Sequence, residues 1–103
     1  MAFPSEAEHF FHELGLRLRT ARINRRESQA DLGARAGVSR QIIIKMEQGD
    51  PAVALGKWVG VSSALGLLQT WAAVLQLPVD PFAEYDRKQR QEQRLKVTRV
   101  RKK

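Results

Sequence analysis

The fold of this chain is decided by one stretch of its sequence, Ser28-Gln-Ala-Asp-Leu-Gly-Ala-Arg-Ala-Gly-Val-Ser-Arg-Gln-Ile-Ile-Ile-Lys-Met-Glu-Gln-Gly49. Ser28 followed by Asp31 is a capping-box pattern, in which a hydroxyl and a carboxylate satisfy free amides at a helix N-terminus. A short helix is therefore predicted from Gln29 to about Arg35. Gly37 is expected to end it in the left-handed conformation that glycine tolerates.

A second short helix is predicted to follow almost at once. Ser39 is its N-cap, Gly49 ends it, and Pro51 prevents its continuation. Five apolar residues are expected to pin the two helices together: Leu32, Ala36, Val38, Ile43 and Met46. The outer face of the second helix then remains available to a partner, and it holds Arg40, Gln41, Ile44 and Lys45.

The flanking sequence predicts three further helices. Residues 5–25 carry an apolar stripe at helical spacing, and residues 55–65 carry another. A short apolar helix is predicted over 67–77, where Pro78 closes it. The chain is therefore expected to be all-α, with five short helices.

A polar tail follows Asp80-Pro81. Its first part, 81–94, is compatible with a helix, whereas its end, 95–100, is β-prone and suited to pairing with another strand.

Charge is distributed very unevenly along the chain. Residues 1–85 hold nine Lys/Arg and nine Asp/Glu, whereas residues 86–103 hold nine Lys/Arg and two acids. The tail therefore carries the whole formal net charge of +7, which indicates a polyanionic partner. Any DNA contact by the body must depend on the local placement of side chains, while the tail can add non-specific attraction to phosphates.

Several function classes find little support in the sequence. The chain has no Cys, so a disulfide framework, a thiolate zinc site and a Cys nucleophile are excluded. His9 and His12 lie three apart without an obvious third ligand, so no metal site is expected. There is no Gly-rich phosphate loop, paired-carboxylate signature or nucleophile motif, so we expect neither an enzyme nor a cofactor. With no signal-peptide pattern and no membrane-spanning run, a cytoplasmic, nucleoid-associated location is expected.

The stretch from Ser28 to Gly49 resembles the motif of the Xre family, the lambda-repressor and Cro-like helix-turn-helix proteins. That motif runs roughly Ser/Thr-Gln, two variable residues, Leu-Ala, three variable residues, Gly-Val-Ser, then an apolar residue and Glu-x-Gly. The resemblance covers about residues 14–77. It implies a five-helix lambda-repressor-like DNA-binding domain over 1–79, followed by a basic C-terminal tail over 80–103. It further implies a transcriptional regulator, most simply a repressor, that binds a palindromic operator as a dimer.

The resemblance also implies roles for single residues. Arg40 would read guanine, Gln41 adenine, and Lys45 a base one turn further along the recognition helix. Gln29 would hold a phosphate and brace that helix, while Arg22 and Glu47 would form a salt bridge that fastens the first helix to the third. The complete set of implied DNA contacts is Gln29, Ser39, Arg40, Gln41, Ile44, Lys45 and Gln48.

Three positions depart from the family pattern. Ile44 stands where many relatives have Ser or a small polar residue. It could meet a thymine methyl, or the helix is rotated slightly and Ile44 packs on a neighbour. Glu27 occupies a position that is usually apolar in the family, and Arg26 occupies one that is often Gly. The loop is then either looser, or Glu27 supplies a charge to the dipole of the next helix.

Two segments leave alternatives open. The fifth predicted helix offers more apolar surface than a small domain needs, so it forms either a dimer interface or ordinary core. The residues concerned are Leu68, Trp71, Val74 and Leu75. The tail is either a solvated run, or an arm that tracks DNA or binds a partner by strand addition through Leu95, Val97 and Val100. Arg25 and Arg26 are either surface charges or phosphate contacts.

A narrower resemblance concerns the stretch Gly49-Asp-Pro-Ala-Val-Ala-Leu-Gly-Lys-Trp, the segment Ala64-Leu-Gly-Leu-Leu and the basic end of the chain. Together they are similar to antitoxin regulators of the HipB type. Those proteins bind a HipA-like kinase toxin and repress their own operon. Two alternatives stand beside this function. The chain could be a protein-interaction module for which DNA binding is secondary, or it could be a phage lysogeny regulator.

Overall fold

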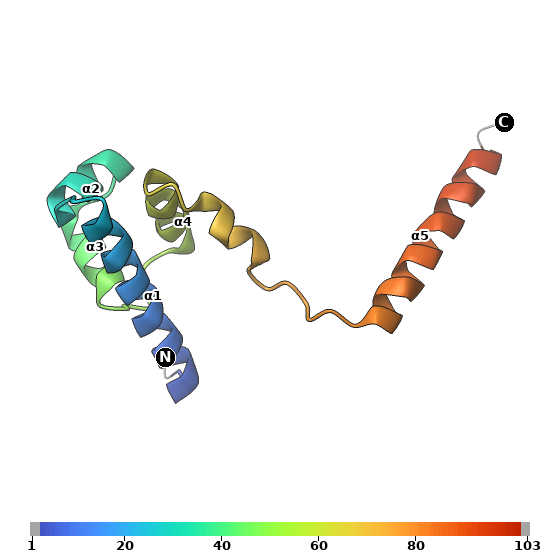
Figure 1. The fold of residues 1–103 in the computed structure, drawn as a ribbon, viewed down its shortest axis with the longest axis horizontal. Coiled ribbons are helices and arrows are strands. Elements are labelled where there is room, and N and C mark those ends of the chain that lie inside the picture. The colour runs from blue at the N-terminus through green and yellow to red at the C-terminus, as the bar shows by residue number, and fades with distance from the viewer. Residues whose placement is uncertain (1–2, 102–103) are drawn as a thin grey trace. The chain divides into compact units, whose positions relative to one another are not determined.

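A computed structural model describes residues 3–101, with side chains described for residues 3–94. The described chain is all-helical, as predicted, and contains no strand. Its elements are α1 (Ser5–Asn24), α2 (Gln29–Ala36), α3 (Arg40–Glu47), α4 (Leu55–Ala64), the short 3-10 helix η1 (Leu68–Ala73) and α5 (Pro81–Arg101) (Figure 1). The described chain divides into two compact units between Ala73 and Val74.

The core of the first unit lies where α2 and α3 meet α1 and α4. Leu32, Ile43 and Met46 have no exposed surface, which confirms that the inner faces of α2 and α3 hold these two helices together. Ala36 and Val38 pack against the same cluster. The remaining core residues are Leu18 of α1, Trp58 and Val61 of α4, and Leu65, which directly follows α4.

The turn between α2 and α3 forms as its residues predict. The Ser28 hydroxyl accepts a hydrogen bond from the Asp31 amide at 3.0 Å, and the Ser39 hydroxyl accepts one from the Ile42 amide at 3.2 Å. Each hydroxyl satisfies an amide that has no partner within its own helix. Gly37 has φ 75°, the left-handed conformation expected for it. Local chemistry alone therefore determines where both short helices begin and how α2 ends.

Helix α1 crosses α3 at Gly15, a residue that the sequence analysis did not single out. Gly15 is buried, and a Cβ atom built there would lie 2.5 Å from the Glu47 carbonyl oxygen and 2.8 Å from that of Met46. Such distances are well below van der Waals contact. The missing side chain therefore lets the backbones of the two helices approach closely, which positions the end of α3.

The prediction of a fifth helix over 67–77 was wrong in type and length, because the segment forms only η1. The Trp71 indole N–H donates to the hydroxyl of buried Ser62 at 2.8 Å, so Trp71 belongs to the core and covers α4. The apolar neighbours Leu68 and Val74 are exposed, and Leu75 is 94% exposed. With Trp71 only partly buried and no fully buried residue, the segment gains too little packing energy to extend a short 3-10 helix into a full α-helix.

The second unit contains α5. The Asp80 carboxylate accepts hydrogen bonds from the amides of Phe82 and Ala83, at 3.0 and 3.4 Å, and Pro81 occupies the first helical position. This pairing of a capping acid with a proline is a strong helix start.

Helix α5 continues to Arg101, so the β-prone stretch 95–100 is helical and forms no strand. Gln, Arg, Lys and Glu are strong helix formers, and acid-to-base pairs four residues apart add to them. Together they outweigh the β-preference of a few branched residues. The side chains of Leu95, Val97 and Val100 lie outside the described residues, as do Lys102 and Lys103. Nowhere in residues 3–101 is a helix long and apolar enough to cross a membrane.

Candidate nucleic-acid interface

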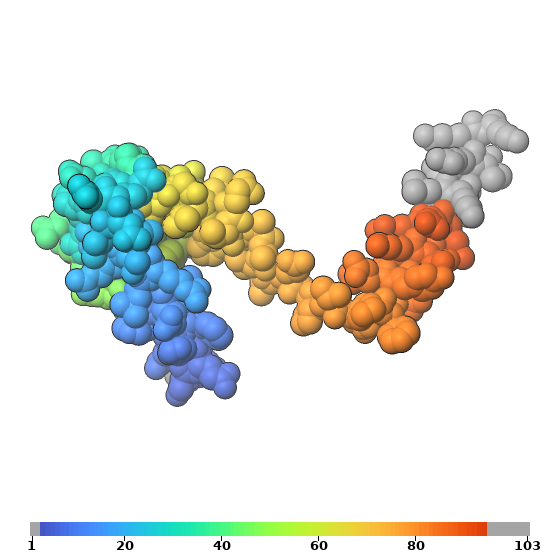
Figure 2. Space-filling view, in the orientation of Figure 1, coloured from blue at the N-terminus to red at the C-terminus, as the bar shows by residue number. Residues whose placement is uncertain are grey.

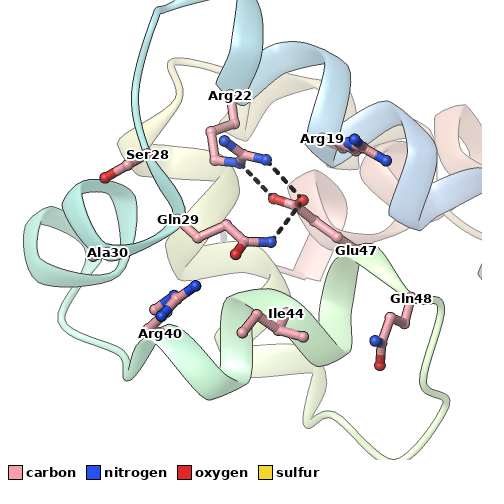
Figure 3. A pocket seen from close by; sticks show the side chains of 9 residues that line it. All are labelled: Arg19, Arg22, Ser28, Gln29, Ala30, Arg40, Ile44, Glu47 and Gln48. Atoms are coloured by element: carbon pink, nitrogen blue, oxygen red, sulfur yellow. Dashed lines mark hydrogen bonds and ion pairs between the residues drawn. The ribbon is translucent and has the colours of Figure 1, made fainter.

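A cleft opens where the N-terminal end of α2 faces α1 and α3 (Figure 3). It brings together side chains from three successive helices and from the residues beside them. Its lining residues are Arg19, Arg22, Ser28, Gln29, Ala30, Arg40, Ile44, Glu47 and Gln48. Four of the DNA contacts implied by the sequence motif line this cleft, namely Gln29, Arg40, Ile44 and Gln48.

The floor of the cleft is an ion pair. Arg22 Nε donates to Glu47 Oε2 at 2.6 Å and Arg22 Nη2 to Glu47 Oε1 at 3.0 Å. The side chains are only 12% and 5% exposed, respectively. The hydrogen bonds to Glu47 raise the pKa of the Arg22 guanidinium, and burial opposes this shift. The pair expected between α1 and α3 is therefore present, with the fork geometry in which arginine binds a carboxylate most strongly.

Gln29 adds a third element to this floor. Its side-chain amide donates to Glu47 Oε1 at 3.3 Å, so the first residue of α2 is tied to the last residue of α3 (Figure 3). This contact provides the brace on α3 that the motif implied. Arg22 also donates to the Glu27 carbonyl at 2.9 Å, which holds the loop before α2.

The rim of the cleft carries positive charge. Arg40, the first residue of α3, lies on one side, and Arg19 of α1 lies on the other; both are exposed (Figure 3). The sequence analysis missed Arg19. Its position three residues before Arg22 on the same helix was a usable signal, because residues three apart share a helix face.

Ile44 lies on the open side of α3. It is half-buried and lines the cleft, while the opposite face of the helix buries Ile43 and Met46. The half-buried side chain therefore packs in part on neighbouring residues and in part faces the cleft. An apolar surface remains beside Arg40, where a ligand can reach it.

The other predicted residues of α3 lie outside the cleft. Gln41 and Lys45 are exposed on the outer face of the helix. The Ser39 hydroxyl is occupied by its capping hydrogen bond, although the residue is exposed. The outer surface of α3 therefore offers one planar cation, one amide and one ammonium group within two turns.

Glu27 has a role that neither interpretation of the loop anticipated. Its carboxylate accepts hydrogen bonds from Arg35 at 2.5 and 3.1 Å and from Arg25 at 3.3 Å. Arg25 also donates to the Leu65 carbonyl at 3.3 Å, and Arg35 donates to the Ala64 carbonyl. Both arginines therefore meet the negative C-terminal end of α4, with Glu27 between them. This arrangement ties the loop before α2 to α4.

Arg26 adopts the left-handed conformation, with φ 57°. This is the backbone region in which glycine is favoured, so the departure from Gly at this position has a conformational cost. The guanidinium of Arg25 donates hydrogen bonds to the Glu27 carboxylate and to the Leu65 carbonyl, so it is not a free surface charge.

Replacing Glu27 with Gln is expected to flatten the acid side of the stability profile. Hydrogen bonds from Arg35, helped by Arg25, hold the pKa of the Glu27 carboxyl below its ordinary value of 4.5. Ionised Glu27 therefore contributes stability above that value, and the contribution is lost as the pH falls through the folded-state pKa. Between about pH 5 and pH 3, the melting temperature of the wild-type protein should fall further than that of Glu27→Gln.

The matched control is Glu8→Gln, which changes an exposed acid in the first turn of α1. Circular dichroism melting curves across the same pH range provide the comparison. Parallel profiles for wild type and Glu27→Gln would show that the carboxylate is not held by its two arginines in solution.

A scan against protein-family models found no match to this chain, and neither did a search of curated proteins. Within the part of the chain that the structure describes, no three His, Asp or Glu side chains gather as they would around a metal ion. His9 lies 3.8 Å from Glu13 on the surface of α1.

Proposed function

We propose that this protein is a sequence-specific DNA-binding transcriptional regulator, most simply a repressor, that inserts α3 into the major groove. The proposal rests mainly on one observation. Helix α3 is buried on one face through Ile43 and Met46, and the opposite face exposes Arg40, Gln41 and Lys45. The major groove, about 12 Å wide, accepts a single helix, and these side chains suit the edges of its bases.

The residues of the site divide into two groups by chemistry. Arg40 has the planar fork that matches guanine O6 and N7, Gln41 can pair with adenine, and Ile44 offers a surface for a thymine methyl. Arg19, Gln29 and Gln48 surround them at the cleft and suit phosphate oxygens. The first group would choose the sequence, and the second would hold the helix in register.

A dimer on a palindromic operator is the simplest assembly for such a helix. Two copies related by a two-fold axis would place their α3 helices about 34 Å apart, on successive major grooves. The segment from Leu67 to Val79 has no charged residue, and it exposes Leu68, Val74 and Leu75. These residues support a contact with a second copy, whereas Trp71 is already used by the core.

A second candidate function is a protein-interaction module, including an antitoxin of the HipB type that holds a HipA-like kinase toxin. One observation favours it. Eight of the large exposed hydrophobic residues fall close together in the sequence, and they are Leu67, Leu68, Val74, Leu75, Leu77, Val79, Phe82 and Tyr85. Apolar surface of this kind is typical of a protein contact. Both functions are compatible, because an autoregulating antitoxin binds DNA and its toxin.

Selection from a random duplex library tests the first function directly. The purified full chain should enrich a two-fold symmetric site, and it should bind the DNA upstream of its own gene more tightly than scrambled DNA. Binding should weaken steeply as salt increases, since phosphate contacts release counterions. Equal affinity for selected and scrambled duplexes would reject the proposal and favour the interaction module.

Arg40→Ala is expected to cost about 1–3 kcal/mol of binding free energy and to relax preference at one base pair of each half-site. The matched comparison is Arg19→Ala, which should weaken binding about equally on every sequence, because a phosphate contact has no base preference. Both effects are measured on a panel of single-base variants of the selected site. An Arg40→Ala protein with an unaltered base preference would remove Arg40 from the base-reading set.

A further inference from the structure

Helix α5 carries seven Lys/Arg and three Asp/Glu, a net charge of +4 on one regular element, and Lys102 and Lys103 follow it in the sequence. The first 85 residues have equal numbers of basic and acidic side chains, while residues 86–103 carry the full excess of +7. All side chains of Pro81–Arg94 are exposed (Figure 2). At 1.5 Å per residue the 21-residue helix is about 31 Å long, close to one turn of duplex DNA. A helix of this length can follow several phosphates.

The sequence of α5 decides what kind of polyanion suits it. Residues 86–94 include Arg87, Lys88 and Arg90 but not one apolar residue. A helix that lies on a membrane surface needs an apolar face that enters the lipid, and this part of α5 has none. A helical segment that is polar all round, as residues 86–94 are, instead suits a fully hydrated ligand such as the phosphate backbone of DNA.

The start of α5 shows that this charge is presented in an ordered way. The Asp80 cap and Pro81 fix its N-terminus, and Gln89 donates to the Tyr85 hydroxyl at 2.9 Å, one turn apart. Glu84 and Asp86 lie four residues before Lys88 and Arg90, the spacing and direction that stabilise an isolated helix. Arg87 and Arg90, three residues apart, share one face.

From these observations we infer that α5 is a second DNA-binding element, which contacts phosphates through Arg87, Lys88 and Arg90 and reads no bases. The choice of duplex DNA as its ligand rests on the proposed function of α3. Gln76–Asp80 has no regular structure, and at about 3.5 Å per residue it spans up to about 17 Å. A tether of that kind makes the second contact intramolecular, so α5 adds affinity without adding specificity.

The test measures affinity against salt for three forms of the full chain: wild type, Arg87→Gln/Lys88→Gln/Arg90→Gln, and the control Gln89→Ala/Gln91→Ala/Gln93→Ala. Gln, Lys and Arg have similar helix propensities and Ala a higher one, so both variants should keep α5 helical. Each form is titrated with the selected duplex and with a scrambled duplex between about 50 and 300 mM KCl. Vesicles of phosphatidylglycerol and phosphatidylcholine are titrated in parallel.

Neutralising the three cations should lower the slope of log affinity against log salt by about 2–3, since each phosphate contact contributes about 0.9. Affinity for both duplexes should fall by at least about tenfold at the lower salt concentrations, while the ratio between them stays constant. The control should match wild type. Equal slopes for wild type and the neutralised form would overturn the inference, as would an effect confined to the vesicles.

Because both duplexes are titrated, failure of the inference about α5 can be distinguished from failure of the function proposed for α3. If α5 sets the slope but no form prefers the selected duplex, the inference holds and the function proposed for α3 fails. If preference for the selected duplex is intact and the slope does not depend on α5, the function stands and the inference fails.

Discussion

Replacing Glu47 with Leu is expected to lower the free energy of unfolding of the first unit by about 3–5 kcal/mol. The carboxylate accepts two hydrogen bonds from Arg22 and one from Gln29, and its side chain is 5% exposed. Its removal leaves the guanidinium of Arg22, whose side chain is only 12% exposed, without its counter-charge. A largely buried cation that loses its counter-charge is among the more costly defects that one substitution can create.

The loss of stability in Glu47→Leu should depend on the charge of Arg22 still being present. The double variant Arg22→Met/Glu47→Leu removes both charges and keeps similar volume, so it should recover most of the loss. Glu13→Leu is the control for loss of an acid, because the Glu13–His9 contact at 3.8 Å is exposed and should contribute less than about 1 kcal/mol. Urea unfolding followed by circular dichroism measures all three. A double variant as unstable as Glu47→Leu would show that the loss comes from packing rather than from the stranded charge.

Gly15→Ala is expected to destabilise the first unit by about 2–4 kcal/mol. An alanine in a helix is normally more stable than a glycine by about 1 kcal/mol, so the expected sign is the reverse of the helix propensity. The reason is that the new methyl group would lie 2.5 Å from the Glu47 carbonyl oxygen. The Cβ atom is fixed to the backbone of α1, and the carbonyl oxygen is part of the backbone of α3. Neither atom can turn away, so the two helices would have to separate.

Gly60→Ala on α4 is the matched control, because a Cβ atom there meets nothing within 4 Å. It should raise the free energy of unfolding by about 1 kcal/mol or less. Separation of α1 from α3 would also displace α3, so Gly15→Ala should weaken binding to a selected duplex more than its stability loss alone explains. If Gly15→Ala proves as stable as Gly60→Ala, the helices do not approach as closely as the structure describes.

Residue patterns predicted the elements around the turn because the interactions that form them are local. Ser28 and Ser39 cap helices through amides three residues away, and Gly37 ends α2 through its own φ angle. The spacing of Ile43 and Met46 likewise determined which face of α3 is buried. The errors concern segments where packing or competing propensities decide. The segment 67–77 forms only the short helix η1, because Trp71 alone makes a hydrogen bond to a buried residue, Ser62.

Helix α5 shows a different kind of error, since the β-prone residues near its end were judged apart from the long helix-forming run that precedes them. Helix formation is cooperative, so a well-capped helix carries a few unfavourable residues with it. The start signal, Asp80-Pro81, was visible in the sequence and had more influence than the branched residues at its end.

The sequence by itself determined the all-helical class, the limits of α2 and α3, the outward face of α3 and the concentration of charge in the tail. Only the tertiary structure decided which distant residues meet. It placed Arg19 on the cleft rim opposite Arg40, brought Gly15 against the backbone of Glu47, and set Glu27 between Arg25 and Arg35 at the end of α4. The physical reason is range. Caps, turns and helical faces depend on hydrogen bonds and side chains a few residues apart, whereas these contacts form only after separate helices pack together.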